Sequence, residues 1–405
     1  MISPTPTRTA LAPTILTLRE YEPATFPAKA IGTADGERLL RNFSHVLDVQ
    51  PPSMRTAGQW QLTSLGWVGH LHVSSALQLS LQPRVPLRNL FGMWEYAYRL
   101  NIAFDPNLYL AQSVPAFYEQ LARVLALRVL DRARAGFVRA YQPRVDRLDY
   151  IAGRLDVRDL VTRPWQAQRL CHFHQHTVDI EDNQILAWTL ALVMRNHLCG
   201  PRVQPTLRQA YRALTPMVSL HLFQGQDCAA RTYNRLNADY AALHALCRFF
   251  LDHTGPMNLA GDQQMLPFLV HMPALFELFV AEWLRQHLPN YLAVRAQQTV
   301  GPATGNALRP RIDLVLYDRA SGRPRLVLDT KYKADARPSE ADVYQVMAYA
   351  DFARCEEALL VYPTSAVRPF QIRTHQKTVR AVSFALDDDL ETSGQRFLQA
   401  ILPAG

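Results

Sequence analysis

The sequence has few cysteines and no apolar run long enough to cross a bilayer. Its five cysteines are odd in number, widely scattered and free of C-x-x-C spacing. This pattern is typical of reduced thiols and unlike a disulfide framework or a zinc site. The longest apolar run, Ile185 to Met194, is shorter than a membrane span, and the N-terminal stretch shows no signal-peptide pattern. We expect a globular, cytoplasmic protein without a membrane partner.

Two further absences limit the chemistry. The chain contains no G-x-x-x-x-G-K-[ST] motif, and the stretch GPATGNALRP (301–310) lacks the lysine that would reach a phosphate. There is no internal repeat and no low-complexity tract, which argues against a solenoid and a disordered arm. Any nucleotide hydrolysis on which the protein depends therefore has to come from a partner.

What the sequence does contain is ample apolar residues and a basic balance. Its 405 residues, 48% of them hydrophobic, suffice for two or three domains with cores of their own. Lysine and arginine number 43 against 35 acidic residues, a formal charge of +8. This excess suits a polyanionic partner without demanding one.

The spacing of apolar residues divides the chain into three parts. Alternation predicts a β-hairpin from two strands, 66–73 and 76–83. Three-and-four spacing predicts helices over 113–141, 179–198 and 235–254. A short extended piece, 153–161, and a linker, 255–261, separate them. We predict a β-rich and helical N-terminal region (1–165), a helical connecting region (166–261) and a C-terminal module (262–405).

The C-terminal module has an informative order of elements. We predict a helix over 272–288, strands over 291–300, 311–318 and 325–333, a helix over 339–352 and a strand over 358–362. The order α-β-β-β-α-β describes a compact mixed α/β module. The predicted fold class of the protein is accordingly mixed α/β.

The second and third of these strands form a predicted hairpin around the polar turn DRASGRP, with Ser321-Gly322 at its tip. Positions equidistant from the tip face one another, so Asp313 lies opposite residues 329–331. Asp329 and Lys331 are two residues apart and share a face of the strand. Two carboxylates and one ammonium group therefore converge at one end of the hairpin, where each needs a partner to offset its desolvation.

This convergence predicts a metal-dependent nuclease site. Two carboxylates suit a hard cation such as Mg²⁺, which makes Asp313 and Asp329 the candidate metal ligands. A nearby lysine, here Lys331, can orient or deprotonate the attacking water, while the cation neutralises charge that develops on a phosphodiester. The alternative is a surface ion-pair cluster without a catalytic role.

Three residues on the neighbouring helices are further candidates. Gln345 and Tyr349 lie four residues apart on one helix face, where they contact the backbone of a bound strand or cap a packing face. Glu277 stands among apolar residues in PALFELFVAEW. It is a candidate third carboxylate or a group that orients the attacking water, and an exposed helix acid is the equally weighted alternative.

The motif RIDLV followed by LDTKYK, with Q-x-x-x-Y on the next helix, resembles the PD-(D/E)xK nuclease superfamily. The resemblance implies that Asp313 and Asp329 bind the metal and that Lys331 assists the attacking water. Gln345 and Tyr349 match the helix motif. The proline that normally precedes the first acid directly is displaced here to Pro310, a position that is loosely held in this superfamily.

The wider sequence resembles the McrC family, the nuclease subunits of McrBC modification-dependent restriction systems. The matching stretches are YIAGRLDVRDLV, DIEDNQILAWTL, MPALFELFVAEWL and LDTKYKA followed by DVYQVMAYA, in that order. The resemblance implies an endonuclease that cleaves methylated double-stranded DNA with Mg²⁺. It also implies an McrB-like AAA+ GTPase ring as partner, which docks on the N-terminal region, binds the GTP and recognises the modified base.

Two other patterns have weaker functional interpretations. The stretch CHFHQH places His172, His174 and His176 on one face if it is a strand, but without a second ligand cluster a structural role is favoured over a metal site. An arginine-rich helix lines DNA or an acidic partner, or is a solvated face. Its arginines are Arg123, Arg128, Arg132, Arg134 and Arg139.

Two alternative functions stay open at this point. One is a non-catalytic adaptor that only stimulates the GTPase ring, against which the intact set of Asp313, Asp329 and Lys331 argues. The other is a stand-alone RecB-like repair nuclease, which the Gln345 and Tyr349 pair favours and the large N-terminal region disfavours. An adjacent reading frame that encodes an AAA+ protein would discriminate between them.

Overall fold

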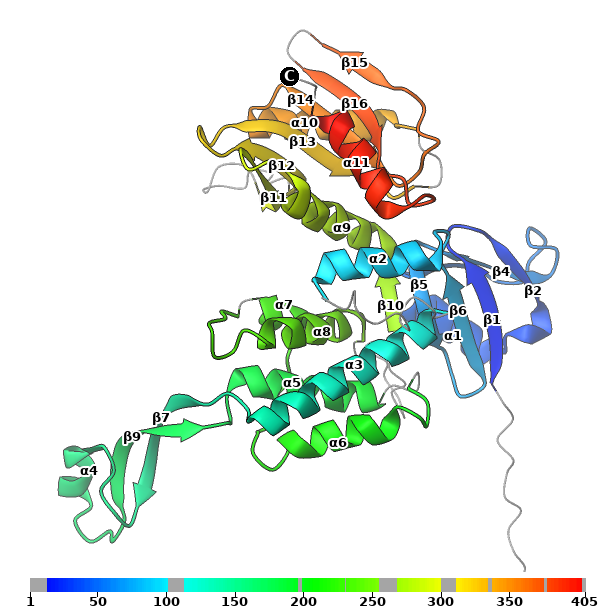
Figure 1. Cartoon of the computed structure of the whole chain (residues 1–405). Coiled ribbons are helices and arrows are strands. Elements are labelled where there is room, and N and C mark those ends of the chain that lie inside the picture. Colours follow the sequence, from blue (N-terminus) through cyan, green and yellow to red (C-terminus); the bar gives the residue numbers. More distant parts are fainter. Residues whose placement is uncertain are drawn as a thin grey trace, which may run out of the picture. The chain divides into compact units, whose positions relative to one another are not determined.

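The computed structural model describes residues 13–100, 113–195, 199–229, 231–254, 268–299, 311–333, 337–374 and 377–402. The chain forms two compact units, and most of their elements are labelled in Figure 1. The first unit joins Met1–Val114 with Met257–Gly405, and the second is Pro115–Pro256. This division differs from the three consecutive regions predicted above, because the two ends of the chain share one unit. The predicted linker 255–261 and the stretch 301–310 lie outside the described residues.

The N-terminal part of the first unit is rich in strands. Its elements are β1 (Thr14–Arg19), β2 (Ala24–Pro27), the short helix η1 (Ala28–Ala30), α1 (Thr33–Asn42), β3 (Leu47–Gln50), β4 (Gln59–Ser64), β5 (Trp67–His72), β6 (Leu77–Gln82) and α2 (Leu87–Tyr98). One sheet has the order β2-β4-β3 and a second the order β1-β6-β5-β10. The predicted hairpin is confirmed, since β5 and β6 pair antiparallel with His72 opposite Gln78.

Strand β10 (Phe268–His271) connects the N-terminal sheet to the C-terminal half of the chain. It pairs antiparallel with β5, and Leu269 lies opposite Gly69. Gly69 has φ +134°, and a Cβ atom there would collide with the carbonyl oxygen of Phe268, so a glycine is required for this close approach. Helix α9 (Met272–His287) follows β10 without a gap. The N-terminal sheet therefore sets where α9 begins.

The C-terminal module is built on a six-stranded sheet of order β11-β12-β13-β14-β16-β15. After α9 its elements are β11 (Leu292–Thr299), β12 (Arg311–Asp318), β13 (Pro324–Thr330), α10 (Glu340–Ala353), β14 (Glu357–Tyr362), β15 (Gln371–Arg373), β16 (Thr378–Ser383) and α11 (Leu390–Ile401). The predicted order α-β-β-β-α-β is found from α9 to β14. Strands β11, β12 and β13 pair antiparallel, whereas β13 and β14 pair parallel. The parallel pair needs a crossover connection, which α10 provides.

Helices pack against this sheet through apolar side chains. Helix α10 packs on the strands through Val343, Val346 and Ala350. Helices α9 and α11 meet in an aromatic cluster in which Trp283 contacts Phe384 and Phe397. Each buried side chain of this size contributes roughly 1.5–3 kcal/mol. Helix α10 starts where it does because Ser339 caps it in a capping box with Asp342.

The second unit combines a helical body with a small sheet of order β7-β9-β8. Its elements are α3 (Val114–Ala135), β7 (Ala140–Leu148), β8 (Arg154–Leu155), α4 (Val157–Thr162), β9 (Arg169–Thr177), α5 (Glu181–Arg195), α6 (Gln204–Leu214), α7 (Gly225–Ala229) and α8 (Tyr240–His253). Helices α5 and α8 lie within the predicted ranges. The helix predicted over 113–141 ends earlier, because Gly136 takes φ +87° and stops it. The piece predicted as extended, 153–161, divides into β8 and α4.

Two expectations about the whole chain can be compared with these elements. No helix of the described residues is long and apolar enough to cross a membrane. All five cysteines are buried and free.

Candidate functional site

The β12–β13 hairpin brings Asp313 to the end of β13. Leu314 pairs with Leu328, which places Asp313 level with Asp329 on the neighbouring strand. Asp313 Oδ2 accepts hydrogen bonds from the backbone N–H and the hydroxyl of Thr330, at 2.9 and 3.1 Å. The convergence predicted from the position of the turn is therefore found in the structure.

Asp329 and Lys331 form a close ion pair at the same strand end. The Lys331 Nζ lies 2.6 Å from Asp329 Oδ2, and the Asp329 side chain is only 2% exposed. The pair is held where β13 ends, since the backbone N–H of Lys331 donates to the carbonyl of Val361 on β14 at 2.8 Å. A strand that only filled a core would gain nothing from these two groups at its end, because both have to be desolvated.

The electrostatics of the pair show an excess of negative charge. Burial raises the pKa of Asp329 to about 6, the charge of Asp313 adds to this rise, and Lys331 opposes it. Burial likewise raises the pKa of Asp313, against the hydrogen bonds from Thr330 and the charge of Lys331. Burial alone would lower the pKa of Lys331, but Asp329 and then Asp342 raise it. One ammonium group is thus shared among several buried acids.

Glu277 on α9 belongs to this group of acids and is not an exposed helix acid. Burial raises its pKa to about 7, and Asp313 adds to the rise while Arg311 opposes it. Its Oε1 atom is buried and has no hydrogen-bond partner among the residues that the structure describes. Of the alternatives considered for Glu277, a place beside Asp313 and Asp329 is therefore the one found.

Gln345 and Tyr349 form a chain of hydrogen bonds that ends on the lysine. Lys331 Nζ donates to Gln345 Oε1 at 2.9 Å, and Gln345 Nε2 donates to the hydroxyl of Tyr349 at 2.7 Å. Both residues lie on one face of α10, as their spacing predicts. Through this chain α10 orients the ammonium group of Lys331.

Two residues at this site, Asp342 and Lys333, were not predicted from the sequence. Asp342 accepts hydrogen bonds from Lys333 Nζ at 2.9 and 2.7 Å and lies 3.7 Å from Lys331 Nζ. Burial raises the pKa of Asp342, but the hydrogen bonds from Lys333 and Ser339 together lower it by more, so the net shift of this pKa is downward. The S-x-x-D spacing of a capping box was the signal in the sequence that could have identified it.

Asp313 and Asp329 are the best-placed residues for a divalent cation. Within the described ranges, no three acidic, histidine or cysteine side chains are arranged to enclose an ion by themselves. Mg²⁺ does not require such a cage, because it is commonly bound through one or two carboxylates and keeps several waters. The raised pKa values of these two acids and the unsatisfied Oε1 atom of Glu277 fit a place that gains from added positive charge.

The histidine cluster and the arginine-rich helix have local structural partners. On β9, His172 Nε2 lies 3.2 Å from Asp156 Oδ2, and the ring of His176 stacks on Tyr141. On α3, Arg132 pairs with Asp239 at 3.4 Å. The histidine contacts agree with the structural role favoured from the sequence.

Comparison with known proteins identifies relatives. The family model described as McrBC 5-methylcytosine restriction system component matches residues 62–363. A curated relative, the Type IV methyl-directed restriction enzyme EcoKMcrBC of Escherichia coli (strain K12), is 23% identical over 308 residues, which cover 70% of this chain and 87% of the relative.

Two solved structures from Thermococcus gammatolerans are similar to the chain. The first is a refined half-complex from a tetradecameric assembly of McrB AAA+ hexamers with bound McrC. It has a TM-score of 0.56 and 16% identity, and covers 96% of this chain and 100% of that chain. The second, a cryo-EM structure of the McrBC complex, has a TM-score of 0.44 and 16% identity, with 69% and 89% covered. The first comparison shows a shared fold.

Proposed function

The chain belongs to the family of McrBC 5-methylcytosine restriction system components, and we propose that it is the McrC-like endonuclease subunit of such a system. It hydrolyses phosphodiester bonds in methylated double-stranded DNA with Mg²⁺. It works with an McrB-like AAA+ GTPase ring that binds the GTP and that it stimulates. Its C-terminal module is the PD-(D/E)xK nuclease.

One observation carries this proposal: two buried acids and a lysine meet at the end of one hairpin. Lys331 Nζ lies 2.6 Å from Asp329, and Asp313 is fixed against the same strand end by Thr330. Buried groups with perturbed pKa values that converge from separate elements are typical of catalytic sites. The family membership and the site chemistry support the same class of reaction, hydrolysis of nucleic acid.

Each residue has a role that follows from its contacts. Asp313 and Asp329 would hold the cation, and Glu277 stands beside them as a third acid. A bound Mg²⁺ supplies positive charge that stabilises the phosphoryl oxygens as they become more negative. Lys331 carries its proton at Nζ, orients the attacking water and adds a second positive charge. Gln345 positions Lys331, and Tyr349 holds Gln345.

We place the docking surface for the ring on the small sheet β7-β9-β8 and α4. Large apolar side chains are exposed there, with Trp165 at 80%. The others are Tyr141, Val145, Tyr150, Ile151, Val157 and Val161. Exposed apolar surface of this density is typical of protein interfaces, and Tyr and Trp are frequent hot spots. The similar McrC chain is described as bound to McrB AAA+ hexamers, and these residues fall within the region 1–165 predicted to dock.

Reconstitution with the partner tests the proposal as a whole. We expect the chain alone to cut DNA little, because the sequence contains no nucleotide-binding motif. The chain together with its AAA+ partner, GTP, Mg²⁺ and methylated DNA should cut, and omitting any one of these should abolish the cuts.

Two outcomes would support other functions. Vigorous cleavage by the isolated chain without GTP would indicate the stand-alone nuclease. Stimulated GTP hydrolysis without any cleavage in the complete mixture would indicate the adaptor.

A Trp165→Ala variant, which removes the most exposed aromatic of the docking surface, should weaken binding of the partner and leave the nuclease module intact.

A further inference from the structure

A glutamate of the N-terminal part is buried against the nuclease module. Glu20 follows β1 and is 0% exposed. Its Oε1 atom accepts hydrogen bonds from the hydroxyl of Tyr332 at 2.6 Å and from the backbone N–H of Arg84 at 3.0 Å. A charged side chain is rarely buried so completely. The shorter of these two hydrogen bonds is to Tyr332, a residue that is far away in the sequence.

Tyr332 is adjacent to the lysine of the proposed site. It follows Lys331 directly in the chain and is buried, with 8% exposed. Its ring packs 5.9 Å from that of Phe276, which precedes Glu277 on α9. Tyr332 is therefore itself the neighbour of one site residue, Lys331, and its ring contacts the neighbour of another, Glu277 on α9.

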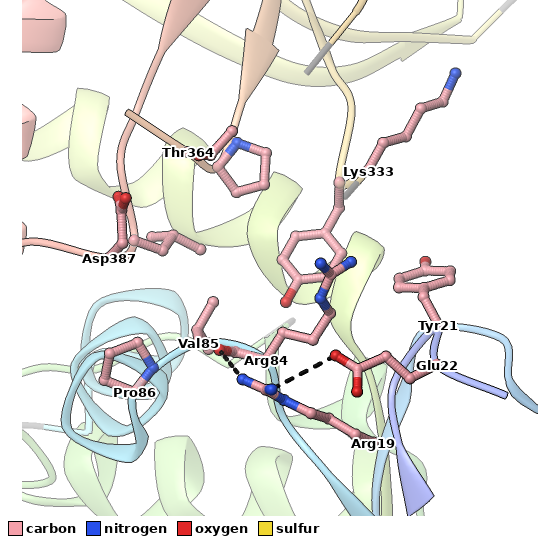
Figure 2. A pocket seen from close by; sticks show the side chains of 12 residues that line it. Arg19, Tyr21, Glu22, Arg84, Val85, Pro86, Lys333, Thr364 and Asp387 are labelled. Carbon is pink, nitrogen blue, oxygen red and sulfur yellow. Dashed lines mark hydrogen bonds and ion pairs between the residues drawn. The ribbon is translucent and has the colours of Figure 1, made fainter. Parts of the chain in front are cut away.

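The hydrogen bond to Glu20 holds a residue that lies just beyond the sheet. Strand β13 ends at Thr330, and the backbone N–H of Lys331 still donates to Val361 of β14 at 2.8 Å, so Tyr332 is the residue that follows this bond. A pocket of about 230 Å³ borders this residue, with Arg84 and Tyr21 of the N-terminal part and Lys333 among its lining residues (Figure 2). Because open space adjoins one side, packing alone does not fix Tyr332, and its hydrogen bond to Glu20 gains importance.

Fixing Tyr332 also fixes the backbone next to Lys331. The backbone N–H of Lys333 donates to the carbonyl of Lys331 at 2.9 Å, which makes a tight turn centred on Tyr332. A tyrosine held by Glu20 therefore fixes the turn that follows the lysine paired with Asp329. We propose that Glu20 is a positioning residue for the nuclease site and acts through Tyr332. The N-terminal part thereby completes the site of the C-terminal module. This inference rests on the proposed function.

Removing one hydroxyl group tests the inference. Tyr332→Phe keeps the ring and its contact with Phe276 but loses the bond to Glu20. A small displacement of a catalytic group costs up to about a hundredfold in rate, and we expect a loss of about tenfold for this single bond. The matched control is Tyr317→Phe, which removes a hydroxyl bonded to Gln298 at 2.5 Å within the same module.

The assay uses the full chain with its AAA+ partner, GTP, Mg²⁺ and methylated DNA. We expect Tyr332→Phe to lower kcat about tenfold, with the KM for DNA, the stimulated GTPase rate and the melting temperature as in Tyr317→Phe. Glu20→Gln keeps an acceptor oxygen and should cleave within about twofold of the unmodified protein. Glu20→Leu removes the acceptor and should lose as much as Tyr332→Phe.

The contrary results are distinct from a failure of the proposed function. Cleavage by Tyr332→Phe at the rate of Tyr317→Phe would overturn the positioning role, as would equal losses in Glu20→Gln and Glu20→Leu. Cleavage by Asp329→Asn at the unmodified rate would instead overturn the site itself.

Discussion

The two ends of the β12–β13 hairpin hold their acids in opposite ways. At the turn end, Asp318 is partly exposed, and its pKa is lowered because it accepts hydrogen bonds from the backbone and hydroxyl of Ser321. At the other end, burial raises the pKa of Asp329 to about 6, and the charge of Asp313 adds to the rise. Asp318 stabilises a turn with its charge. Asp329 is kept ionised against its surroundings, which is the condition that a cation relieves.

The largest expected effect on DNA cleavage concerns the basic residues at the two ends of β13, Arg325 and Lys331. Lys331→Ala should lower DNA cleavage by at least about a hundredfold, because it removes the group that orients water and stabilises charge. Arg325→Ala, which removes an exposed positive charge near the turn end of the same strand, should leave cleavage unchanged. Steady-state cleavage rates in the reconstituted complex measure the difference. Equal rates in the two variants would remove the distinction between the hairpin ends.

A smaller effect concerns stability. Without Mg²⁺ at pH 7, Asp329→Asn should raise the free energy of unfolding by about 1 kcal/mol, because the folded state no longer carries a carboxylate that it disfavours. The penalty is complete above the folded pKa of about 6 and declines as the pH falls from there toward the ordinary pKa of 3.8, so the gain should be smaller at pH 5. Asp318→Asn should instead lower stability slightly, since the lowered pKa of Asp318 means that its charge stabilises the fold at pH 7.

Mg²⁺ should offset the gain in the free energy of unfolding that Asp329→Asn has over the unmodified protein. At ten times its dissociation constant, the ion stabilises the folded state by about 1.4 kcal/mol, in the unmodified protein and in Asp318→Asn but not in Asp329→Asn. Urea denaturation with and without Mg²⁺ measures all three proteins. A gain from Mg²⁺ in Asp329→Asn equal to that in the unmodified protein would exclude Asp329 as a ligand.

The sequence predicts the hairpin and its acids because the information is local. A polar turn between two apolar strands determines which residues face one another, and strand alternation then puts Asp329 and Lys331 on one side. The helix spacing of Gln345 and Tyr349 is local in the same sense. Gln345 bonds to Lys331, and Tyr349 bonds to Gln345. These contacts form because α10 connects two parallel strands, β13 and β14, and packs beside the end of β13.

The sequence could not predict contacts between distant segments. Glu20 and Tyr332 meet because β10 pairs with β5 and fixes the start of α9 beside the N-terminal sheet, and no periodicity encodes that pairing. The burial of Glu277 likewise depends on how α9 packs. The boundaries of the two compact units differ from those of the three predicted regions for the same reason. The apolar pattern of a strand as short as β10 is too weak to be recognised alone.

The most direct test of the central claim is a paired assay on Asp329→Asn and Asp318→Asn in the complex with the AAA+ partner, GTP, Mg²⁺ and methylated DNA. DNA cleavage and stimulated GTP hydrolysis are measured on each variant. We predict that Asp329→Asn loses cleavage and keeps GTPase stimulation, while Asp318→Asn keeps both. Loss of both activities in Asp329→Asn would mean a structural ion pair, and cleavage at the unmodified rate would contradict the account.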